Sequence, residues 1–500
     1  MTSPSLSDRA SPWWHLPALA VGACMLVTFF FSPRVVVWRG LDAPETWFYP
    51  ELNRAVDALR QLEAPFADIE NPSNMVIEWR LFFPLVGHWT GMPWWLYLAL
   101  PHVGSVLAVA WLIRILRDRT GDAAMACGGA VAVAASAWFF VSAGWLAYFD
   151  AWFVLGLLAV AFADARVALA LACLATPWVD ERFVLALPLV MAVRVADRAG
   201  KSAPRRLWLD LAVIVAASVP YPMARLVALS QATDASGQYV QLMREHLADV
   251  SPWRFIEGAW SGFRAAWVFP ACAMVMLWTS RPRWLFVLTA ATALGTAAAC
   301  LVVAADMSRS FAMLLPLAVL GVVWCATHPD VRWRRAVPLI AAANLLLPAS
   351  HVLWTFKEPV YYVYHEWYRW QNPPADLTPQ YYMQEAMDAS QGGDLKQAAH
   401  LLSNAIALDR GFAPSYVGRA AIAMERGHLE QAGFDLAMAL ELDPRSSDAL
   451  FGRGLLRQRQ GDRAGAARDM QSALALAPPD WPNLAACQRA LTELAGPAAP

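Results

Sequence analysis

The segments GDLKQAAHLLSNAIALDR (393–410), GHLEQAGFDLAMALELDP (427–444) and GDRAGAARDMQSALALAP (461–478) decide the fold of the C-terminal part of this chain. They begin 34 residues apart and keep one register, with glycine first at Gly393, Gly427 and Gly461. Alanine recurs at two further positions of each segment, namely Ala398, Ala405, Ala432, Ala439, Ala466 and Ala473. Proline closes the second and third segments at Pro444 and Pro478. Because alanine lets helix backbones approach and glycine suits the turn between helices, this period predicts stacked helix pairs.

The repeated unit resembles the tetratricopeptide repeat, in which two antiparallel helices pack through small residues and proline ends the second helix. Three repeats cover residues 379–478, and the tail at 479–500 contains a predicted capping helix at 481–494. Charged residues stand where the first helix usually carries an apolar one, at Glu385, Arg419 and Arg453, and Arg457 replaces a large core residue. The resemblance implies an α-solenoid whose groove binds a protein or peptide partner, without catalytic residues.

Composition separates this tail from the rest of the 500-residue chain. Hydrophobic residues make up 58% of the sequence and charged residues only 16%, against roughly 25% charged in typical soluble proteins. Of the 25 tryptophans, 24 precede residue 379, and the formal net charge of −1 gives no indication of a nucleic-acid partner. The seven cysteines have no metal-site or redox spacing, which indicates small buried hydrophobic residues.

Apolar segments before residue 355 predict membrane-spanning helices, because a bilayer core about 30 Å thick needs roughly 20 apolar residues in a helix. Eleven segments qualify: 13–31, 94–113, 123–141, 148–163, 165–179, 183–196, 207–230, 265–279, 284–304, 311–327 and 336–354. The fifth and sixth are short and meet at Asp180-Glu181-Arg182, which predicts a hairpin with its tip near one membrane face. The sequence therefore predicts an all-α bundle of about eleven spans over residues 13–355, joined to the repeats by a linker at 356–378.

Arginine and lysine in the short loops predict the orientation. Alternate loops are rich in arginine, at 114–119, 166, 194–206, 281–283 and 332–335, whereas the opposite short loops hold almost none. The arginine-rich loops and the leader 1–12 are therefore expected in the cytoplasm. The long loops 32–92 and 231–263 and the repeats are then extracytoplasmic, and a bacterial inner membrane is the expected location. Residues 49–62 place apolar residues at helical spacing, which favours a helix on the membrane surface.

Carboxylates gather on the predicted outer face. Asp42 and Glu45 lie in the string GLDAPETW (40–47), and Asp180 and Glu181 lie at the hairpin tip. Ionisable residues at a membrane face are costly to bury and tend to be functional. Each also has a plainer interpretation: the first two as solvated loop residues, the hairpin tip as a self-neutralising turn, and Arg80 as a snorkelling side chain.

The architecture resembles that of the polytopic glycosyltransferases of the GT-C superfamily. The resemblance rests on an apolar segment followed by a long outer loop with early acidic residues, a surface helix at 49–62, and the later string WVDERF (178–183). It covers about residues 13–355. With repeats after the last span, the chain is also similar to the repeat-containing transmembrane O-mannosyltransferases. These resemblances imply a lipid-linked sugar donor of the polyprenyl-phosphate type, an inverting transfer, and repeats that hold the acceptor.

Such a transfer needs a general base that accepts the proton of the acceptor hydroxyl. Asp42 is the first candidate for this base and Glu45 the second. We expect the first outer loop to pack over the hairpin tip, so that the base faces the Asp180-Glu181-Arg182 turn. The cleft between them should be open to lipid for the donor and to water for a protein acceptor.

The departing lipid phosphate needs a cation, and arginine binds phosphate through two parallel hydrogen bonds. The candidates for this phosphate-binding role are Arg182, Arg80 and Arg309. Asp180 and Glu181 are expected to orient Arg182 or to hold a divalent cation. No other cofactor is predicted.

Two other classes of function compete with the transferase. One is a non-enzymatic scaffold or assembly factor, in which a membrane anchor carries repeats that recruit proteins. The other is a transporter, which the lack of inverted symmetry between the apolar segments disfavours. Enzyme and scaffold differ at the outer face, because only an enzyme needs the carboxylates and arginines to converge on one site.

Overall fold

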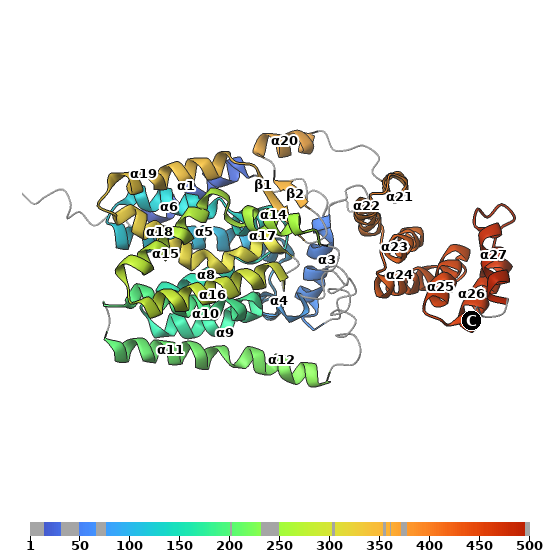
Figure 1. The fold of residues 1–500 in the computed structure, drawn as a ribbon, viewed down its shortest axis with the longest axis horizontal. Coiled ribbons are helices and arrows are strands. Elements are labelled where there is room, and N and C mark those ends of the chain that lie inside the picture. Colours follow the sequence, from blue (N-terminus) through green and yellow to red (C-terminus); the bar gives the residue numbers. More distant parts are fainter. Residues whose placement is uncertain are drawn as a thin grey trace, which may run out of the picture. The chain divides into compact units, whose positions relative to one another are not determined.

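The computed structural model describes residues 15–31, 50–66, 77–200, 203–231, 250–302, 306–353, 357–360, 362–371 and 378–495. These residues separate into a first unit that ends at Gln371 and a second unit formed by the repeats. Both units are helical, and the strands described form one two-stranded sheet. Figure 1 shows the helices of the first unit stacked beside one another.

The helices of the first unit follow its apolar runs. They are α1 (His15–Phe30), α3 (Pro50–Glu63), α4 (Phe82–Thr90), α5 (Trp94–Thr120), α6 (Ala123–Ala134), α7 (Ala137–Gly144), α8 (Asp150–Phe162), α9 (Arg166–Val179), α10 (Arg182–Arg198), α11 (Pro204–Ser218), α12 (Pro220–Gln231), α14 (Pro252–Phe263), α15 (Val268–Ser280), α16 (Arg283–Val302), α17 (Met307–Ser310), α18 (Leu315–Thr327), α19 (Val331–Leu346) and α20 (Val363–Gln371). Short 3-10 helices, Arg264–Trp267 and Phe311–Leu314, follow α14 and α17. Within the predicted outer loop at 231–263, Gln231 is the last residue of α12 and residues 252–263 form α14.

The core of this unit lies around α8 and α18, whose apolar residues are nearly all buried. Local sequence explains the ends of several helices. Asp122 and Asp330 accept hydrogen bonds from the first backbone N–H groups of α6 and α19, which stabilises those N-termini. Gly121 ends α5 in the left-handed conformation that glycine adopts readily.

The number of spans differs from the prediction of eleven. Among the described residues, five helical segments are long and apolar enough to cross a membrane: Trp94–Thr120, Pro204–Val227, Pro252–Ser280, Arg283–Leu301 and Met307–Thr327. Helices α6 and α7 make a sixth if they count as one span bent by 70°. Helices α1, α8 and α9 are apolar but shorter.

Two local features explain part of this difference. Ser136 separates α6 from α7, and its Oγ donates to the Val133 carbonyl at 2.6 Å, which competes with regular helix bonding. Helix α19 ends at Leu346 because Pro348 cannot continue it. The chain then enters β1 (Ala349–Val352), which pairs antiparallel with β2 (Lys357–Val360) in the register Ala349 to Val360. The predicted span at 336–354 and the predicted linker at 356–378 thus contain a hairpin and α20.

Helix α3 occupies the position of the predicted membrane-surface helix at 49–62, but its buried face includes polar residues as well as apolar ones. Its buried side carries Arg54, Asp57 and Gln61, whereas Val56 is exposed. Arg54 donates from Nε to the Ala147 carbonyl at 3.2 Å. The helix is therefore held to the protein through polar side chains, and not only through an apolar stripe.

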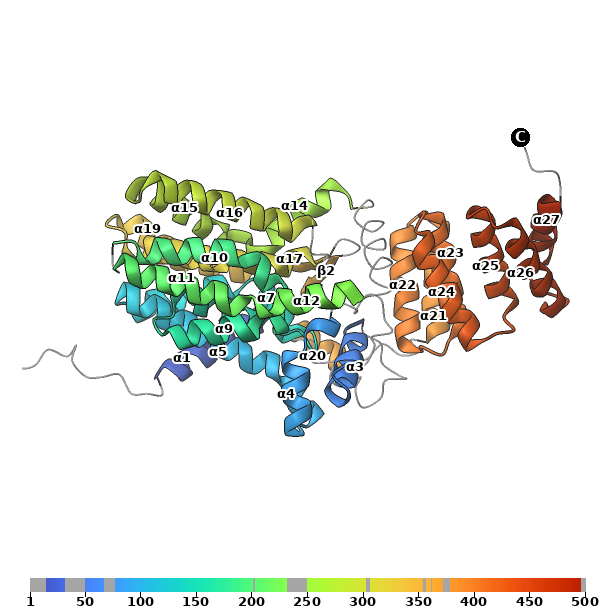
Figure 2. The ribbon, with the colours of Figure 1, turned by 90° about the horizontal axis from the view of Figure 1, so that it is seen from below.

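The described residues of the second unit form three helix pairs and a final helix, and Figure 2 shows these helices lying beside one another. The pairs are α21 (Pro379–Gln391) with α22 (Leu395–Leu408), α23 (Ala413–Glu425) with α24 (Leu429–Leu442), and α25 (Ser447–Arg459) with α26 (Arg463–Leu476). The predicted capping helix is α27 (Leu484–Ala495), which begins after Trp481. Gly393, Gly427 and Gly461 have φ of +80°, +81° and +86° in the turns within the pairs. The six repeated alanines predicted to pack are all fully buried.

Three of the four charged residues that depart from the repeat pattern, Arg419, Arg453 and Arg457, form ion pairs inside the repeats, whereas Glu385 is exposed. Arg419 of α23 donates to both carboxylate oxygens of Asp435 in α24, at 2.9 and 2.6 Å. One repeat later, Arg453 binds Asp469 in the same way, at 2.9 and 2.8 Å. Burial lowers the pKa of Arg419, but the charge of Asp435 outweighs this effect and raises it overall. A buried pair therefore replaces an apolar contact at this position.

Candidate functional site

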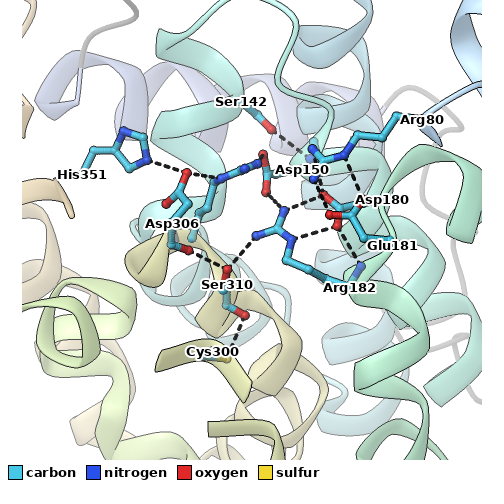
Figure 3. A network of polar contacts seen from close by, with 12 residues as sticks. Arg80, Ser142, Asp150, Asp180, Glu181, Arg182, Cys300, Asp306, Ser310 and His351 are labelled. Carbon is cyan, nitrogen blue, oxygen red and sulfur yellow. Dashed lines mark hydrogen bonds and ion pairs between the residues drawn. The ribbon is translucent and has the colours of Figure 1, made fainter. Parts of the chain in front are cut away.

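Ion pairs join the ends of several helices of the first unit into one network, drawn in Figure 3. We call it the Arg182 network; its members are Arg80, Asp150, Asp180, Glu181, Arg182, Asp306, Arg309, Ser310 and His351. They come from the residues before α4, the start of α8, the turn between α9 and α10, helix α17 and its approach, and β1. Helix ends carry unpaired backbone groups, so polar side chains collect there more readily than along apolar helix faces.

Arg80 joins the network at the hairpin tip. Its Nε and Nη2 donate to the two carboxylate oxygens of Glu181, at 3.0 and 2.8 Å. Its Nη1 lies 3.4 Å from Asp180 Oδ2. The Arg80 and Asp180 side chains are buried, whereas the Glu181 side chain keeps 31% of its surface exposed. Glu181 is therefore the member of this group that solvent reaches.

Arg182 is the centre of the network. It donates to both oxygens of Asp180, at 2.8 and 2.6 Å, and to Asp150 Oδ1 at 2.5 Å. Its Nη1 reaches Ser310 Oγ at 3.1 Å. All of these side chains are buried. Removing one charged member would leave its partners buried without compensation, so the network fixes how α8, α10 and α17 meet.

Arg309 and His351 complete the network on the side of the β hairpin. Arg309 donates from Nη1 to Asp150 Oδ2 at 2.9 Å and from Nε to Asp306 Oδ2. His351 Nε2 lies 2.8 Å from the same Asp306 oxygen. Asp306 Oδ1 and His351 Nδ1 are buried and have no hydrogen-bond partner among the described residues.

The electrostatics keep the carboxylates ionised. Burial raises the pKa of Asp180, but the nearby charges of Arg182 and Arg80 outweigh burial and hold this pKa well below its usual range. Burial also raises the pKa of Asp306, but Arg309 and His351 outweigh burial and hold this pKa below its usual range. The Arg182 network thus contains three arginines and four carboxylates that compensate one another.

The five predicted phosphate-binding and orienting residues all lie in this network: Arg80, Arg182, Arg309, Asp180 and Glu181. Arg80, from the end of the first long loop, contacts the hairpin tip. Asp42 and Glu45 lie outside the described residues. The described residues hold no group of three metal-ligating side chains, and arginines already bind Asp180 and Glu181, so no divalent cation is assigned here.

Four members of the network were not among the predicted site residues: Asp150, Asp306, Ser310 and His351. Asp150 follows an apolar segment as an isolated acid, which is the only signal that pointed to it. Asp306 and His351 belong to parts of the chain whose pattern gave no indication of a site. They join the network through tertiary packing, because the isolated bridge between Asp306 and Leu353 brings the β hairpin to α17.

A second network lies at the opposite ends of the same helices. Its members are Arg119, Asp164, Arg166, Arg194, Asp197, Arg198 and Asp210. Arg119 donates to both oxygens of Asp197, at 3.2 and 2.8 Å, in a fork like that of Arg80. Arg281 donates to the Ala199 carbonyl at 2.8 Å and so links the α15–α16 connection to this end.

No protein-family model matches this chain, and a search of curated proteins finds no match. Among solved structures the chain is similar to the Arabidopsis OM64 TPR domain, at 26% sequence identity and a TM-score of 0.21. That similarity covers 23% of this chain and 93% of the other. The repeat character of the second unit rests on its own paired helices and 34-residue register.

Proposed function

We propose that the first unit is embedded in a membrane. Large apolar side chains are exposed along its longest helices, including Val215, Leu226, Val287 and Leu294, of which Leu294 is 72% exposed. Water-soluble proteins seldom expose contiguous apolar surfaces of this kind, whereas lipid covers them without cost. The scarcity of charge on the long helices agrees with this location.

The orientation that the loops predict is part of the proposal. Arginines collect at the connections α5–α6, α8–α9, α10–α11, α15–α16 and α18–α19. The first four of these connections contribute to the second network or contact it. Short arginine-rich connections stay in the cytoplasm. The N-terminus is then cytoplasmic, and the Arg182 network and the repeats are extracytoplasmic, in a bacterial inner membrane.

We further propose that the Arg182 network is the phosphate-binding end of a glycosyltransferase. The observation that supports this role is the fork between Arg80 and Glu181. Arg80 is buried, yet the carboxylate that occupies its two donors is the most exposed acid of the network. A phosphate monoester presents two oxygens in the same geometry, so a lipid phosphate can take the place of Glu181 on Arg80.

Transfer then proceeds from a polyprenyl-phosphate sugar to an acceptor hydroxyl. Arg80 stabilises the charge that develops on the departing phosphate. Arg182, which pairs with the same Asp180, adds a second positive charge. Asp42 and Glu45 remain the candidate bases from the first loop. The repeats hold a protein acceptor.

If phosphate competes with Glu181 for Arg80, replacing Arg80 and replacing Glu181 should change phosphate affinity in opposite directions. Purified protein in detergent is titrated with a short-chain polyprenyl phosphate, with the corresponding alcohol as the uncharged control, and binding is followed by thermal shift. Arg80→Gln should weaken phosphate binding about 10- to 100-fold, the equivalent of a charged hydrogen bond worth about 1.5–3 kcal/mol. Glu181→Gln should strengthen it, because the competing charge is lost.

The matched control is Asp197→Asn, which breaks the similar fork on Arg119 at the opposite end and should leave phosphate binding unchanged. Equal binding of phosphate and alcohol, or weaker binding in Glu181→Gln, contradicts a phosphate site at Arg80.

A membrane-anchored scaffold is the second candidate, and the repeat unit is the observation that favours it. Helical repeats bind proteins without chemistry, and the Arg182 network would then serve only to fix the helix ends. In that case Arg80→Gln and Glu181→Gln would change stability but not ligand binding.

A further inference from the structure

His351 and Asp306 form a pair that neither the repeats nor phosphate binding explains. His351 lies on β1 and is 2% exposed, and its Nε2 is 2.8 Å from Asp306 Oδ2. The ring of Trp145 meets the imidazole edge-on at 5.0 Å. Its other nitrogen, Nδ1, is buried without a hydrogen-bond partner among the described residues. Figure 3 shows the imidazole directed toward Asp306 at the edge of the network.

The hydrogen bonds determine which nitrogen is basic. Asp306 also accepts from Arg309, which keeps its carboxylate ionised, so Asp306 accepts the Nε2–H of His351. An imidazole that carries its single proton on Nε2 has its lone pair on Nδ1. This is the arrangement in which a carboxylate orients a histidine so that the second nitrogen receives a proton.

Other bases of the network are already engaged. Asp150 binds Arg182 and Arg309, one with each oxygen, and Asp180 binds Arg182 through both. Glu181 occupies Arg80. The groups that face His351 are Asp306, Arg309 on α17, and the rings of Trp145 and Tyr148 between α7 and α8.

We infer that His351, oriented by Asp306, is the proton acceptor of the transfer reaction; this inference rests on the proposed function. The acceptor O–H bond breaks and its proton moves to Nδ1 while the oxygen forms a bond to the anomeric carbon. The bond from that carbon to the phosphate oxygen breaks. The lipid phosphate keeps the electron pair of that bond and leaves bound to Arg80. Asp306 then stabilises the imidazolium.

Access to Nδ1 requires β1 to move from α17, to which the Val352 N–H is tied through Ser308 Oγ at 3.0 Å. This movement breaks that hydrogen bond and uncovers Val352, which is fully buried. An acceptor hydroxyl that enters there supplies the hydrogen bond that Nδ1 lacks.

Nitrogen NMR of the full-length protein with labelled histidine tests the state of the ring without any substrate. The chain has nine histidines, and the His351 signals are those that disappear in His351→Gln. At neutral pH, Nδ1 should resonate as an unprotonated nitrogen, and Asp306→Ala should mix the two tautomers. A protonated Nδ1 in the wild-type protein overturns the inference.

A transfer assay with labelled polyprenyl-phosphate hexoses tests the role. His351→Gln should lower turnover about 10²- to 10⁴-fold, without a comparable change in donor KM, and should remove the acid limb of the pH profile. The control His328→Gln should retain turnover. If the wild-type protein transfers sugar and His351→Gln does so equally well, the inference alone is wrong. If the wild-type protein transfers none, the proposed function and the inference both fail.

Discussion

Buried arginines hold the helix ends of the first unit through pairs with carboxylates, and Arg182 pairs with both Asp150 and Asp180. Replacing Arg182 with alanine leaves Asp150 and Asp180 buried with less compensation. We expect a loss of about 3–5 kcal/mol in unfolding free energy, measured by denaturation in detergent. Arg114→Ala is the control, because that side chain is 68% exposed and pairs only with Asp118 one turn away; its effect should stay within about 0.5 kcal/mol. Equal effects would show that the network does not stabilise the fold.

Single residues were predictable where local sequence concentrates charge. The string WVDERF (178–183) places three charges between apolar helices, so it stood out. Arg264 could not be singled out in this way, because the neighbouring sequence does not show that this side chain is fully buried. It donates to the carbonyls of Leu347 and Ala135, at 2.8 and 2.5 Å, just after α19 and α6 end. Such a contact depends on which helix ends meet, and that is a property of the tertiary structure.

Among the described glycines, Gly321 permits the closest approach between two helices, that of α18 to α15. A Cβ added to Gly321 would lie 1.8 Å from the Phe269 carbonyl oxygen, which is backbone and cannot turn aside. Gly321→Ala should therefore separate these helices and cost about 1–3 kcal/mol. Gly295→Ala, inside α16, is the control: a Cβ there meets nothing within 4 Å, so it should stabilise the helix by about 0.5–1 kcal/mol. Thermal unfolding of both variants in detergent checks this, and a neutral Gly321→Ala would contradict it.

The Arg–Asp pairs of the repeats suit a double-mutant cycle. The first repeat has Glu385 and Leu401 where the second has Arg419 and Asp435. Arg419→Met and Asp435→Leu should each destabilise the repeat unit by about 3–5 kcal/mol, because each leaves a charge buried without a partner. The double variant should lose less stability than the sum of the two single losses, with a coupling energy of about 0.5–3 kcal/mol. Additive losses in chemical denaturation would mean that the pair is not coupled.

Element types were predictable from periodicity, but helix lengths were not. Hydropathy located apolar segments well, yet a turn such as that at Ser136 and the proline after α19 divide or shorten helices in ways that hydrophobicity does not record. The repeats behaved differently. Their glycines and alanines recur every 34 residues because each pair repeats the same contact, so sequence alone specified the packing.

For the molecule as a whole, orientation is a prediction from the arginine-rich connections. Alkaline phosphatase fused to the C-terminus should be active, and a fluorescent protein that matures only in the cytoplasm should be dark there. A fusion in the α10–α11 connection should give the opposite pattern. The reverse result at the C-terminus would place the repeats in the cytoplasm and remove the protein acceptor from the proposed reaction.

The central claim is that the Arg182 network binds a lipid phosphate during sugar transfer. The most direct measurement incubates membranes that contain the full-length protein with a panel of labelled polyprenyl-phosphate hexoses and follows the label into protein. We expect transfer by the wild-type protein from at least one donor, and a loss of about 10- to 100-fold in Arg80→Gln. No transfer from any donor by folded wild-type protein, or equal transfer by Arg80→Gln, would contradict it.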